Sequence, residues 1–463
     1  MTARLRYLIK FALGDLASLR ERLLADSSRE HFAVLLAKTR TVGDLTIMTV
    51  IDLLFPAHAD YQQQGLAHLR LNKAFIHRVL VELTRRYDVD TLIDVHTHPF
   101  TQTGVSFSAT DDEDERRFFR FLNGTFEGVH YASIVFSQTR YAARVWTKRS
   151  DTLVARKTLL KAQTSSESIL GTDSGHGPAR HSASADLAAE TGVFHRGTLA
   201  LGLEVMRAIM DDQVIALVGI GGLGSVIAEH LIHMGFHTLH LIDPDTLEMS
   251  NLNRVVGASY EDAEQQRPKV DVVRKHLLRI HPHATVRAHQ CDVHDPAIEP
   301  VLARSDWIIV ATDTHASRLK AQELSLQYFV PLISVGVNLS VKHGAIEDMS
   351  GEVITARVGD ALCLYCLGRI DPIQVASERH PDRAIRDALL TRGYVTGKEV
   401  KEPAVKTLNA FLATMAVEAL INQYTQARQH VPILVYENNA SMSIYEDRES
   451  LRLRNRRCFL CRL

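Results

Sequence analysis

A strand, a turn and the start of a helix are predicted by residues 214–225, Val-Ile-Ala-Leu-Val-Gly-Ile-Gly-Gly-Leu-Gly-Ser. The first five residues are apolar, as in a strand that is buried in a sheet. Glycines then stand at four positions, Gly219, Gly221, Gly222 and Gly224. Such a turn lets backbone amides and a helix N-terminus approach a phosphate group. The pattern therefore indicates a phosphate site, although a glycine turn alone also serves simple packing.

Further short apolar runs follow along the C-terminal part of the chain. They alternate with helix-like segments, which predicts an α/β fold with a doubly wound, Rossmann-like and mostly parallel sheet. The expected strands are Val214–Val218, His240–Ile242, Thr285–Ala288, Trp307–Val310 and Leu332–Val335. Asp243 follows the second strand, where an acidic side chain suits the hydroxyls of a ribose. This acid favours a bound nucleotide over simple packing.

The residues after Asp243 differ from those expected of a dehydrogenase. A second acid stands at Asp245, and two cations follow at Arg254 and Lys269. Fixed cations can neutralise the charge that builds on a polyphosphate under attack, which hydride transfer does not require. Asp313 follows a further strand on the ligand side of the sheet and is a candidate ligand for Mg²⁺. These residues imply ATP rather than NAD.

The order of these motifs resembles that of the ThiF/MoeB-type adenylating enzymes, which include the ubiquitin-activating family. The shared motifs are Gly-x-Gly-Gly-x-Gly, Asp-x-Asp, Ser-Asn-Leu-x-Arg, Lys and Asp, and the resemblance covers about residues 193–461. It implies that Asp243 binds ribose and that Asp313 binds the metal ion. It implies that the phosphates are contacted by Asn251, Arg254 and Lys269. It also implies a homodimer, in which Arg196 reaches the ATP of the partner subunit.

Five cysteines in a chain of 463 residues exclude a disulfide scaffold, and four of them form two Cys-x-x-Cys pairs. The pairs are Cys363 with Cys366 and Cys458 with Cys461. Four thiolates in two chelating pairs suit a closed, tetrahedral zinc site that ties the end of the chain to its domain. The sequence therefore predicts a structural Zn²⁺, and similar zinc sites occur in the resembled family.

The fifth cysteine bears on whether a thioester forms. Thioester-forming members of the resembled family carry a cysteine in the segment that crosses over the adenylate, which corresponds to about residues 367–409 and contains none here. Cys291 follows an expected strand and is interpreted as a packed residue near the nucleotide rather than a nucleophile. Two outcomes stay open: the reaction stops at the adenylate, or the acyl group passes directly to a cysteine of another protein.

A second group of functional residues lies in the N-terminal part of the chain. Leu92-Ile-Asp-Val-His-Thr-His-Pro99 places His96 and His98 on the same side of an extended strand end. Asp111 follows in an acidic segment typical of a helix start. Two histidines and one carboxylate can hold Zn²⁺ and leave a position for water, which predicts a hydrolytic site with Glu30 as general base. An isolated pair of histidines would instead be a polar strand end.

The order Glu30, His96-Thr-His98-Pro and Ser108-x-x-Asp111 resembles that of the JAMM (JAB/MPN-type) metallopeptidases. The resemblance covers roughly residues 15–150, and the interval from His98 to Ser108 is about two residues longer than is usual in that family. It implies an α+β domain with a catalytic zinc on the two histidines and Asp111. Glu30 would be the base, and Ser108 would support the oxyanion. These enzymes cut isopeptide or peptide bonds after ubiquitin-like tails.

Composition and local patterns suggest how the chain divides. A Ser-, Thr- and Gly-rich stretch favours a flexible linker over 159–192, between a domain at 1–158 and another at 193–463. The first domain is expected to contain strands at Phe32–Ala37, Ile47–Phe55 and Leu92–Val95 and a helix at Leu66–Arg85. Charged residues balance to a net −1, which argues against nucleic acid or an anionic membrane as obligatory partner. No export signal or spanning segment is recognised, so the cytoplasm is expected.

The two halves together suggest one bifunctional enzyme. One half would cleave at the tail of a ubiquitin-like protein, and the other would adenylate the C-terminal carboxylate with ATP and Mg²⁺. A conjugating enzyme is a further possible partner. A second hypothesis is processing and activation of a sulfur-carrier protein, or adenylation that modifies a peptide. A third hypothesis, from a different class, is a nucleotide-binding scaffold that only senses its ligand.

Overall fold

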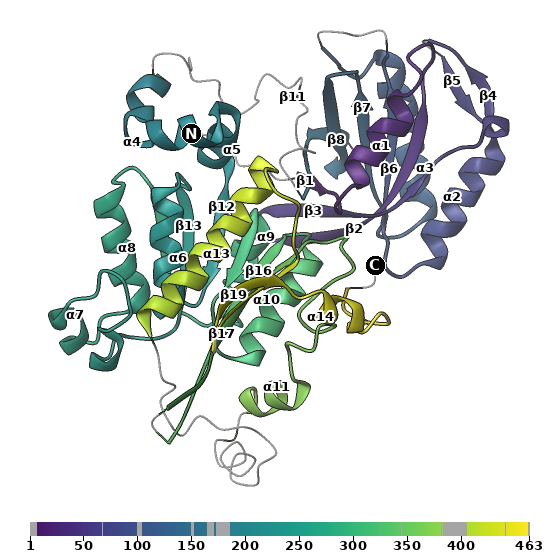
Figure 1. Cartoon of the computed structure of the whole chain (residues 1–463). Coiled ribbons are helices and arrows are strands. Elements are labelled where there is room, and N and C mark those ends of the chain that lie inside the picture. The colour runs from purple at the N-terminus through teal and green to yellow at the C-terminus, as the bar shows by residue number, and fades with distance from the viewer. Residues whose placement is uncertain are drawn as a thin grey trace. The chain divides into compact units, whose positions relative to one another are not determined.

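The structure is a computed structural model that describes residues 7–66, 68–99, 104–149, 152–163, 171–172, 186–343, 345–380, 382, 405–439 and 441–461. The chain divides into two compact units, Met1–His181 and Ser182–Leu463. Each unit has its own sheet and its own apolar core (Figure 1). None of the helices in the described ranges is both long enough and apolar enough to cross a bilayer.

The N-terminal unit is built on a mixed sheet. Within the described residues this sheet runs in the order β10-β1-β3-β2-β6-β7-β8-β11, with β9 also paired to β8, and β4 and β5 form a separate hairpin. The strands are β1 (Tyr7–Lys10), β2 (Phe32–Val42), β3 (Leu45–Leu54), β4 (Tyr61–Gln64), β5 (Leu69–Leu71), β6 (Thr91–Thr97), β7 (His130–Phe136), β8 (Arg140–Arg149), β9 (Thr152–Lys157), β10 (Leu159–Lys161) and β11 (Gly171–Thr172). Strand β6 is therefore central, with β2 antiparallel on one side and β7 parallel on the other.

Helices cover both faces of this sheet. On one face α1 (Asp15–Leu24) buries Leu16, Leu19 and Leu23 in a core shared with alternate residues of β2 and β6. On the other face lie α2 (Lys73–Arg85) and α3 (Ala109–Thr125), whose Phe75 and Phe119 belong to a second core. A short 3₁₀ turn, η1 (His58–Asp60), precedes β4. The alternation of side chains along a strand sends successive residues into these two cores.

Two expectations for this unit are corrected by the structure. The helix predicted from Leu66 begins at Lys73, because Leu69–Leu71 pair as β5 and the Asn72 side chain caps the helix by accepting from the amide of Phe75. Both ends of the linker predicted over 159–192 have regular structure, because Leu159–Lys161 pair with β1 as β10 and a helix begins at Asp186. The linker's residues 164–170 and 173–185 lie outside the described residues.

The C-terminal unit contains an open sheet in the order β14-β13-β12-β15-β16-β17-β18-β19. Its strands are β12 (Val214–Val218), β13 (Thr238–Ile242), β14 (Thr285–His289), β15 (Trp307–Val310), β16 (Leu332–Lys342), β17 (Ala345–Ala356), β18 (Ile433–Asn438) and β19 (Met442–Glu446). The strands from β14 to β16 in this order pair in parallel. From β16 onward each strand pairs antiparallel with the next, through β17 and β18 to β19. The order reverses between β12 and β15, which is where doubly wound sheets bind ligands at the carboxyl ends of their strands.

Helices sandwich this sheet as well. The helices and 3₁₀ turn are α4 (Asp186–Leu201), α5 (Leu203–Asp212), α6 (Gly222–His233), η3 (Met249–Asn251), α7 (Tyr260–Glu264), α8 (Lys269–Ile280), α9 (Glu299–Arg304), α10 (His315–Gln327), α11 (Pro372–Glu378), α13 (Lys406–Thr425) and α14 (Arg448–Leu453). One face of the sheet shares its core with α6, α8 and α13, whereas α9 and α10 pack against β12 and β15 from outside this core. The predicted mixed α/β architecture is confirmed for this unit, whose sheet is parallel from β14 to β16 and antiparallel from β16 to β19.

Candidate functional site

The glycine turn joins the end of β12 to the start of α6. Gly219 has a φ of +91°, which a side chain rarely tolerates. A Cβ added at Gly224 would lie 1.9 Å from the carbonyl oxygen of Gly219. A Cβ added at Gly221 would meet nothing within 4 Å. The turn is thus tightly packed beneath Gly224 and open beside Gly221, as a cradle for an anion requires.

Asp243 holds this turn in place. Its Oδ2 accepts a hydrogen bond from the backbone amide of Ile220 at 2.6 Å, and its Oδ1 accepts one from the amide of Asp245 at 2.9 Å. Burial raises the pKa of the Asp243 carboxyl, which Lys269 and the two amides oppose. The predicted ribose ligand is therefore also the residue that ties the glycine turn to the end of β13.

The predicted cations lie at the same turn. The Nζ atom of Lys269 is 2.7 Å from Oδ2 of Asp245, and its side chain is mostly buried. The Arg254 side chain covers the turn, since a Cβ added at Gly222 would lie 2.8 Å from Arg254 Cδ. Asn251 is buried, and its Oδ1 accepts from the amide of Glu248. Both cations are thus held beside the glycine turn by residues that are far from it in sequence.

The residues after β15 also lie beside the glycine turn. The carbonyl oxygen of Ala311 would lie 2.8 Å from a Cβ added at Gly219, and Asp313 follows two residues later. Arg318, in the first turns of α10, donates to the carbonyl oxygen of Thr312 at 3.1 Å. Burial lowers the pKa of Arg318, while Glu352 and Asp313 oppose the shift. Asp313 is exposed at this edge, as a ligand for a metal ion on a bound nucleotide needs to be.

Two side chains at this edge are absent from the sequence-based candidates. Arg318 is one, and Asn409 of α13 is the other, because its Nδ2 would lie 2.6 Å from a Cβ at Gly222. Asn409 is buried among apolar residues of α13. A lone asparagine inside an apolar helical run is the signal that could have drawn attention to it.

Two other sequence candidates lie elsewhere. Arg196 is exposed on α4, and among the described residues no hydrogen bond or ion pair joins it to the glycine turn. Cys291 follows β14 and is half-buried. Burial raises the pKa of its thiol, and Asp295 and Asp292 reinforce the shift. A raised pKa disfavours the thiolate, so the interpretation of Cys291 as a packed residue agrees with its surroundings.

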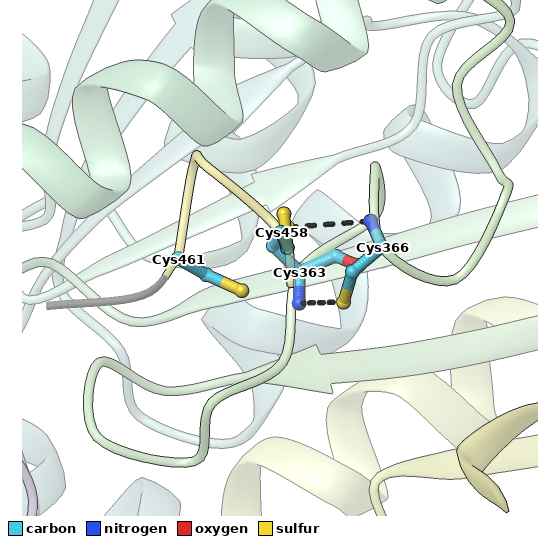
Figure 2. Close-up of side chains that lie close together, drawn as sticks. All are labelled: Cys363, Cys366, Cys458 and Cys461. Carbon is cyan, nitrogen blue, oxygen red and sulfur yellow. Dashed lines mark hydrogen bonds between the residues drawn. The ribbon is translucent and has the colours of Figure 1, made fainter. Parts of the chain in front are cut away.

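The four remaining cysteines meet in space (Figure 2). Cys363 and Cys366 lie in the segment after β17, and Cys458 and Cys461 follow α14. All four sulfurs lie within 4.8 Å of one another, and the Sγ atoms of Cys363 and Cys458 are 3.6 Å apart. Sulfurs around a tetrahedral zinc at about 2.3 Å would be about 3.8 Å apart. The donor set and its spacing therefore fit the predicted structural zinc.

A comparison with known families settles the family of this unit. The ThiF family model matches residues 197–460, which is more than half of the chain. The chain belongs to the ThiF family. Every predicted site residue of the C-terminal unit except Arg196 and Cys461 lies within the matched residues, and so does the newly found Asn409.

Curated relatives match a smaller part of the chain. The molybdopterin-synthase adenylyltransferase of Escherichia coli is 32% identical over 166 residues, which cover 35% of this chain and 61% of the relative. The sulfur carrier protein ThiS adenylyltransferase of the same organism is 31% identical over 134 residues, or 29% of this chain and 52% of the relative. The chain thus spans between about half and three-fifths of the length of these ThiF-family relatives.

The crystal structure of Escherichia coli MccB with ATP is also similar to this chain. It has a TM-score of 0.45 and 17% identity, and the alignment covers 58% of this chain and 74% of that one. The N-terminal unit lies outside the ThiF match, so its site has to be judged from its own geometry.

His96, His98 and Asp111 come together in the N-terminal unit. The Nε2 atom of His96 lies 3.5 Å from Oδ1 of Asp111, and that of His98 lies 3.6 Å from Oδ2. The three ligand atoms lie within 4.8 Å of one another. Nε2 of His96 is buried and has no hydrogen-bond partner, which is costly unless a ligand binds it. The arrangement fits a metal ion with two histidine ligands and one carboxylate ligand.

Glu30 and Ser108 flank this cluster. Glu30 lies two residues before β2, and its amide donates a hydrogen bond to the carbonyl oxygen of Gly65. The first residue of β2, Phe32, is in register with His96. Burial raises the pKa of the Glu30 carboxyl to about 7, which His96 opposes and Asp111 reinforces. Ser108 is the N-cap of α3: its Oγ accepts from the amide of Asp111, and its own amide donates to Asp111 Oδ2 at 2.6 Å. This capping box orients the carboxylate that faces the histidines.

A buried polar layer supports the cluster, and the sequence-based candidates did not include it. Asp94 lies two residues before His96 on the same side of β6 and accepts a hydrogen bond from the hydroxyl of Tyr131. Glu115 of α3 accepts from Arg144 Nε at 2.8 Å and from Trp146 Nε1 at 2.6 Å. The signal available in the sequence is an acid, Asp94, between apolar residues of a strand.

Proposed function

We propose that the C-terminal unit uses ATP to adenylate the C-terminal carboxylate of a small carrier protein of the ubiquitin-like or sulfur-carrier kind. The observation that carries this proposal is the convergence of two cations and two strand-end acids on one glycine turn. Two relatives are named for such reactions, molybdopterin-synthase adenylyltransferase and sulfur carrier protein ThiS adenylyltransferase. Adenylation of a modified peptide is the alternative substrate for the same site.

The roles of the residues follow from their positions. The amides of the turn would bind phosphate oxygens, and Asp243 would face the ribose. Arg254 and Lys269 would stabilise the charge that develops as the carboxylate attacks the α-phosphate and pyrophosphate leaves. Asp313 would hold Mg²⁺, which when bound supplies charge neutralisation on the phosphates. Asp243, Lys269 and Arg254 are already held by hydrogen bonds, so these three groups need little reorganisation.

The test is exchange of labelled pyrophosphate into ATP in the presence of a carrier protein that ends in Gly-Gly. We expect Asp313→Ala to lower the exchange rate at least 100-fold, because the metal ion loses its protein ligand. Glu418→Ala, which removes an exposed acid on the far part of α13, is the matched control and should keep the rate. A nucleotide-binding scaffold would bind ATP but show no exchange with any carrier or peptide, and that result would refute adenylation.

We also propose that the N-terminal unit hydrolyses a peptide or isopeptide bond in a zinc-dependent way, as in the JAMM metallopeptidases. The observation that carries this proposal is the convergence of His96, His98 and Asp111, with an unpartnered nitrogen on His96. These three residues would hold the zinc ion, which when bound supplies an electrophile and an acidified water. Glu30 would move the proton from the water to the leaving amine. Ser108, besides capping α3, would support the oxyanion.

Hydrolysis is tested by intact-mass analysis of a ubiquitin-like precursor with residues beyond its Gly-Gly, incubated with the enzyme and zinc. We expect Glu30→Gln to slow cleavage by about 100- to 10,000-fold, the usual contribution of a general base. Glu82→Gln, on the exposed side of α2, is the matched control. Cleavage that survives in both Glu30→Gln and His96→Ala would refute this site.

The same experiment relates the two activities. If the cleaved carrier is then adenylated, both units serve one substrate, and a conjugating enzyme or a sulfur donor would act next.

A homodimer in which Arg196 completes the partner's ATP site remains part of the proposal. Arg196→Ala would then lower exchange in the dimer, and mixing it with an Asp313→Ala chain would restore part of the activity.

A further inference from the structure

A cavity of about 290 Å³ lies in the N-terminal unit beside the histidine cluster. It is lined by the loop before α3, by the start of β8 and by the end of β9. Val105, Phe107 and Ala142 provide apolar surface. A space of this size holds one side chain or a short chain end rather than a folded domain.

The charged side chains that line this cavity are both cationic. Among the described residues that line it, Arg144 and Lys157 carry charge and none is acidic. Arg144 already binds Glu115 through Nε and Asp112 through Nη1, yet its Nη2 is buried and has no hydrogen-bond partner. An unsatisfied buried donor on Arg144, together with the ammonium of Lys157, points to an acceptor that carries negative charge.

The position of the cavity relates it to the proposed hydrolytic centre. The ring of Phe107 lies 6.1 Å from the ring of His96, and the guanidinium of Arg144 lies 3.7 Å from the centre of the Phe107 ring. Phe107 thus forms a wall between the histidine cluster and the cavity. An extended peptide advances about 3.3 Å per residue, so a chain at the metal would reach the cavity two or three residues away.

We infer that this cavity is a specificity subsite for a carboxylate on an apolar stem, in the peptide that the N-terminal unit cleaves. The inference rests on the proposed hydrolysis for its biological meaning, although binding can be measured without cleavage. The carboxylate has two sources, a Glu or Asp side chain near the scissile bond or the free C-terminus of the segment that is removed. Val105, Phe107 and Ala142 would contact the stem, and Arg144 and Lys157 would bind the carboxylate.

Binding is tested on the full chain with 4-(trifluoromethyl)phenylacetate, followed by the fluorine NMR signal. The matched probe is its primary amide, which has the same shape and no charge. We expect the carboxylate to bind at least tenfold more tightly than the amide. Lys157→Met should remove most of this preference, whereas Lys148→Met, on an exposed part of β8 outside the cavity, should not.

A second variant fills the space. Ala142→Leu lies in the cavity wall and should abolish binding of both probes, with circular dichroism showing that the unit is folded. Equal affinity for acid and amide, no binding of either, or unchanged binding in Ala142→Leu would overturn the inference.

The peptides that the enzyme cleaves show which of the two sources supplies the carboxylate. A pool of randomised octapeptides, once with free and once with amidated C-termini, is digested and sequenced by mass spectrometry. Enrichment of Glu or Asp at one position within three residues of the cut identifies a side chain, and cleavage of the free-acid pool alone identifies a chain end. Cleavage with neither preference would overturn the subsite. If neither pool is cleaved while the carboxylate probe binds as expected, the hydrolysis proposal fails and the subsite stands.

Discussion

Gly224→Ala is expected to destabilise the C-terminal unit by about 3 kcal/mol or more and to abolish ATP binding. The new Cβ would lie 1.9 Å from the carbonyl oxygen of Gly219, and 2.9 Å from its carbonyl carbon. Both obstacles are backbone, so relief requires α6 to move away from the end of β12. Hydrogen exchange of the peptides that cover β12 and α6 measures the loss of stability, and calorimetric titration with a non-hydrolysable ATP analogue measures the loss of binding.

Gly221→Ala is the matched substitution in the same turn. Its backbone is extended, with a φ of −81°, and the added Cβ meets nothing within 4 Å. The stability of the unit should therefore change by less than about 0.5 kcal/mol. ATP affinity should nevertheless fall at least tenfold, because the methyl group would project into the space where phosphate oxygens are expected. Normal ATP binding in Gly224→Ala would contradict the role of this turn.

The second large effect is expected at the cysteine cluster. Cys458→Ser should remove one zinc ion per chain, since the other three thiolates cannot close a tetrahedral site. We expect a loss of about 3–5 kcal/mol, which corresponds to a fall of about 10 °C in the melting temperature for a unit of this size. The loss should appear as faster hydrogen exchange around Cys363 and throughout α14, because the metal joins these two segments.

Cys291→Ser is the control for this experiment, because Cys291 is half-buried and outside the cluster. It should keep the zinc content and the melting temperature. Elemental analysis of the purified variants gives the stoichiometry, and a separate His96→Ala variant accounts for zinc in the N-terminal unit. Full zinc content in Cys458→Ser would show that the four cysteines do not form one site.

The sequence alone reveals some residues of the C-terminal sites and misses others. The glycine turn and the Cys-x-x-Cys pairs depend on spacing within a few residues, so their local chemistry is legible in the sequence. Asn409 lies in a helix far along the chain from Gly222, and nothing local marks it as a neighbour of the turn. Arg318 is only six residues from Thr312 in the sequence, but the turn between β15 and α10 decides whether its guanidinium reaches that carbonyl.

The N-terminal unit shows where local patterns are insufficient. The short strand β10 is predicted as part of a linker, because two leucines before a Ser- and Thr-rich stretch carry little periodicity. Their burial depends on pairing with β1, at the other end of the unit. Ser108 was assigned from motif order to the oxyanion, whereas its position shows that it also caps α3 and orients Asp111.

The amino-acid sequence by itself determined the kinds of ligand atom, the glycine positions and the alternation of strands and helices, because covalent spacing and side-chain periodicity are local properties. Tertiary structure alone decided which distant side chains share a site: Asn409 beside Gly222, Phe32 in register with His96, and Arg144 over Phe107. Tertiary structure likewise decided the cavity behind Phe107. Its shape and the unsatisfied donor of Arg144 arise from strand pairing and packing, which no short window of sequence contains.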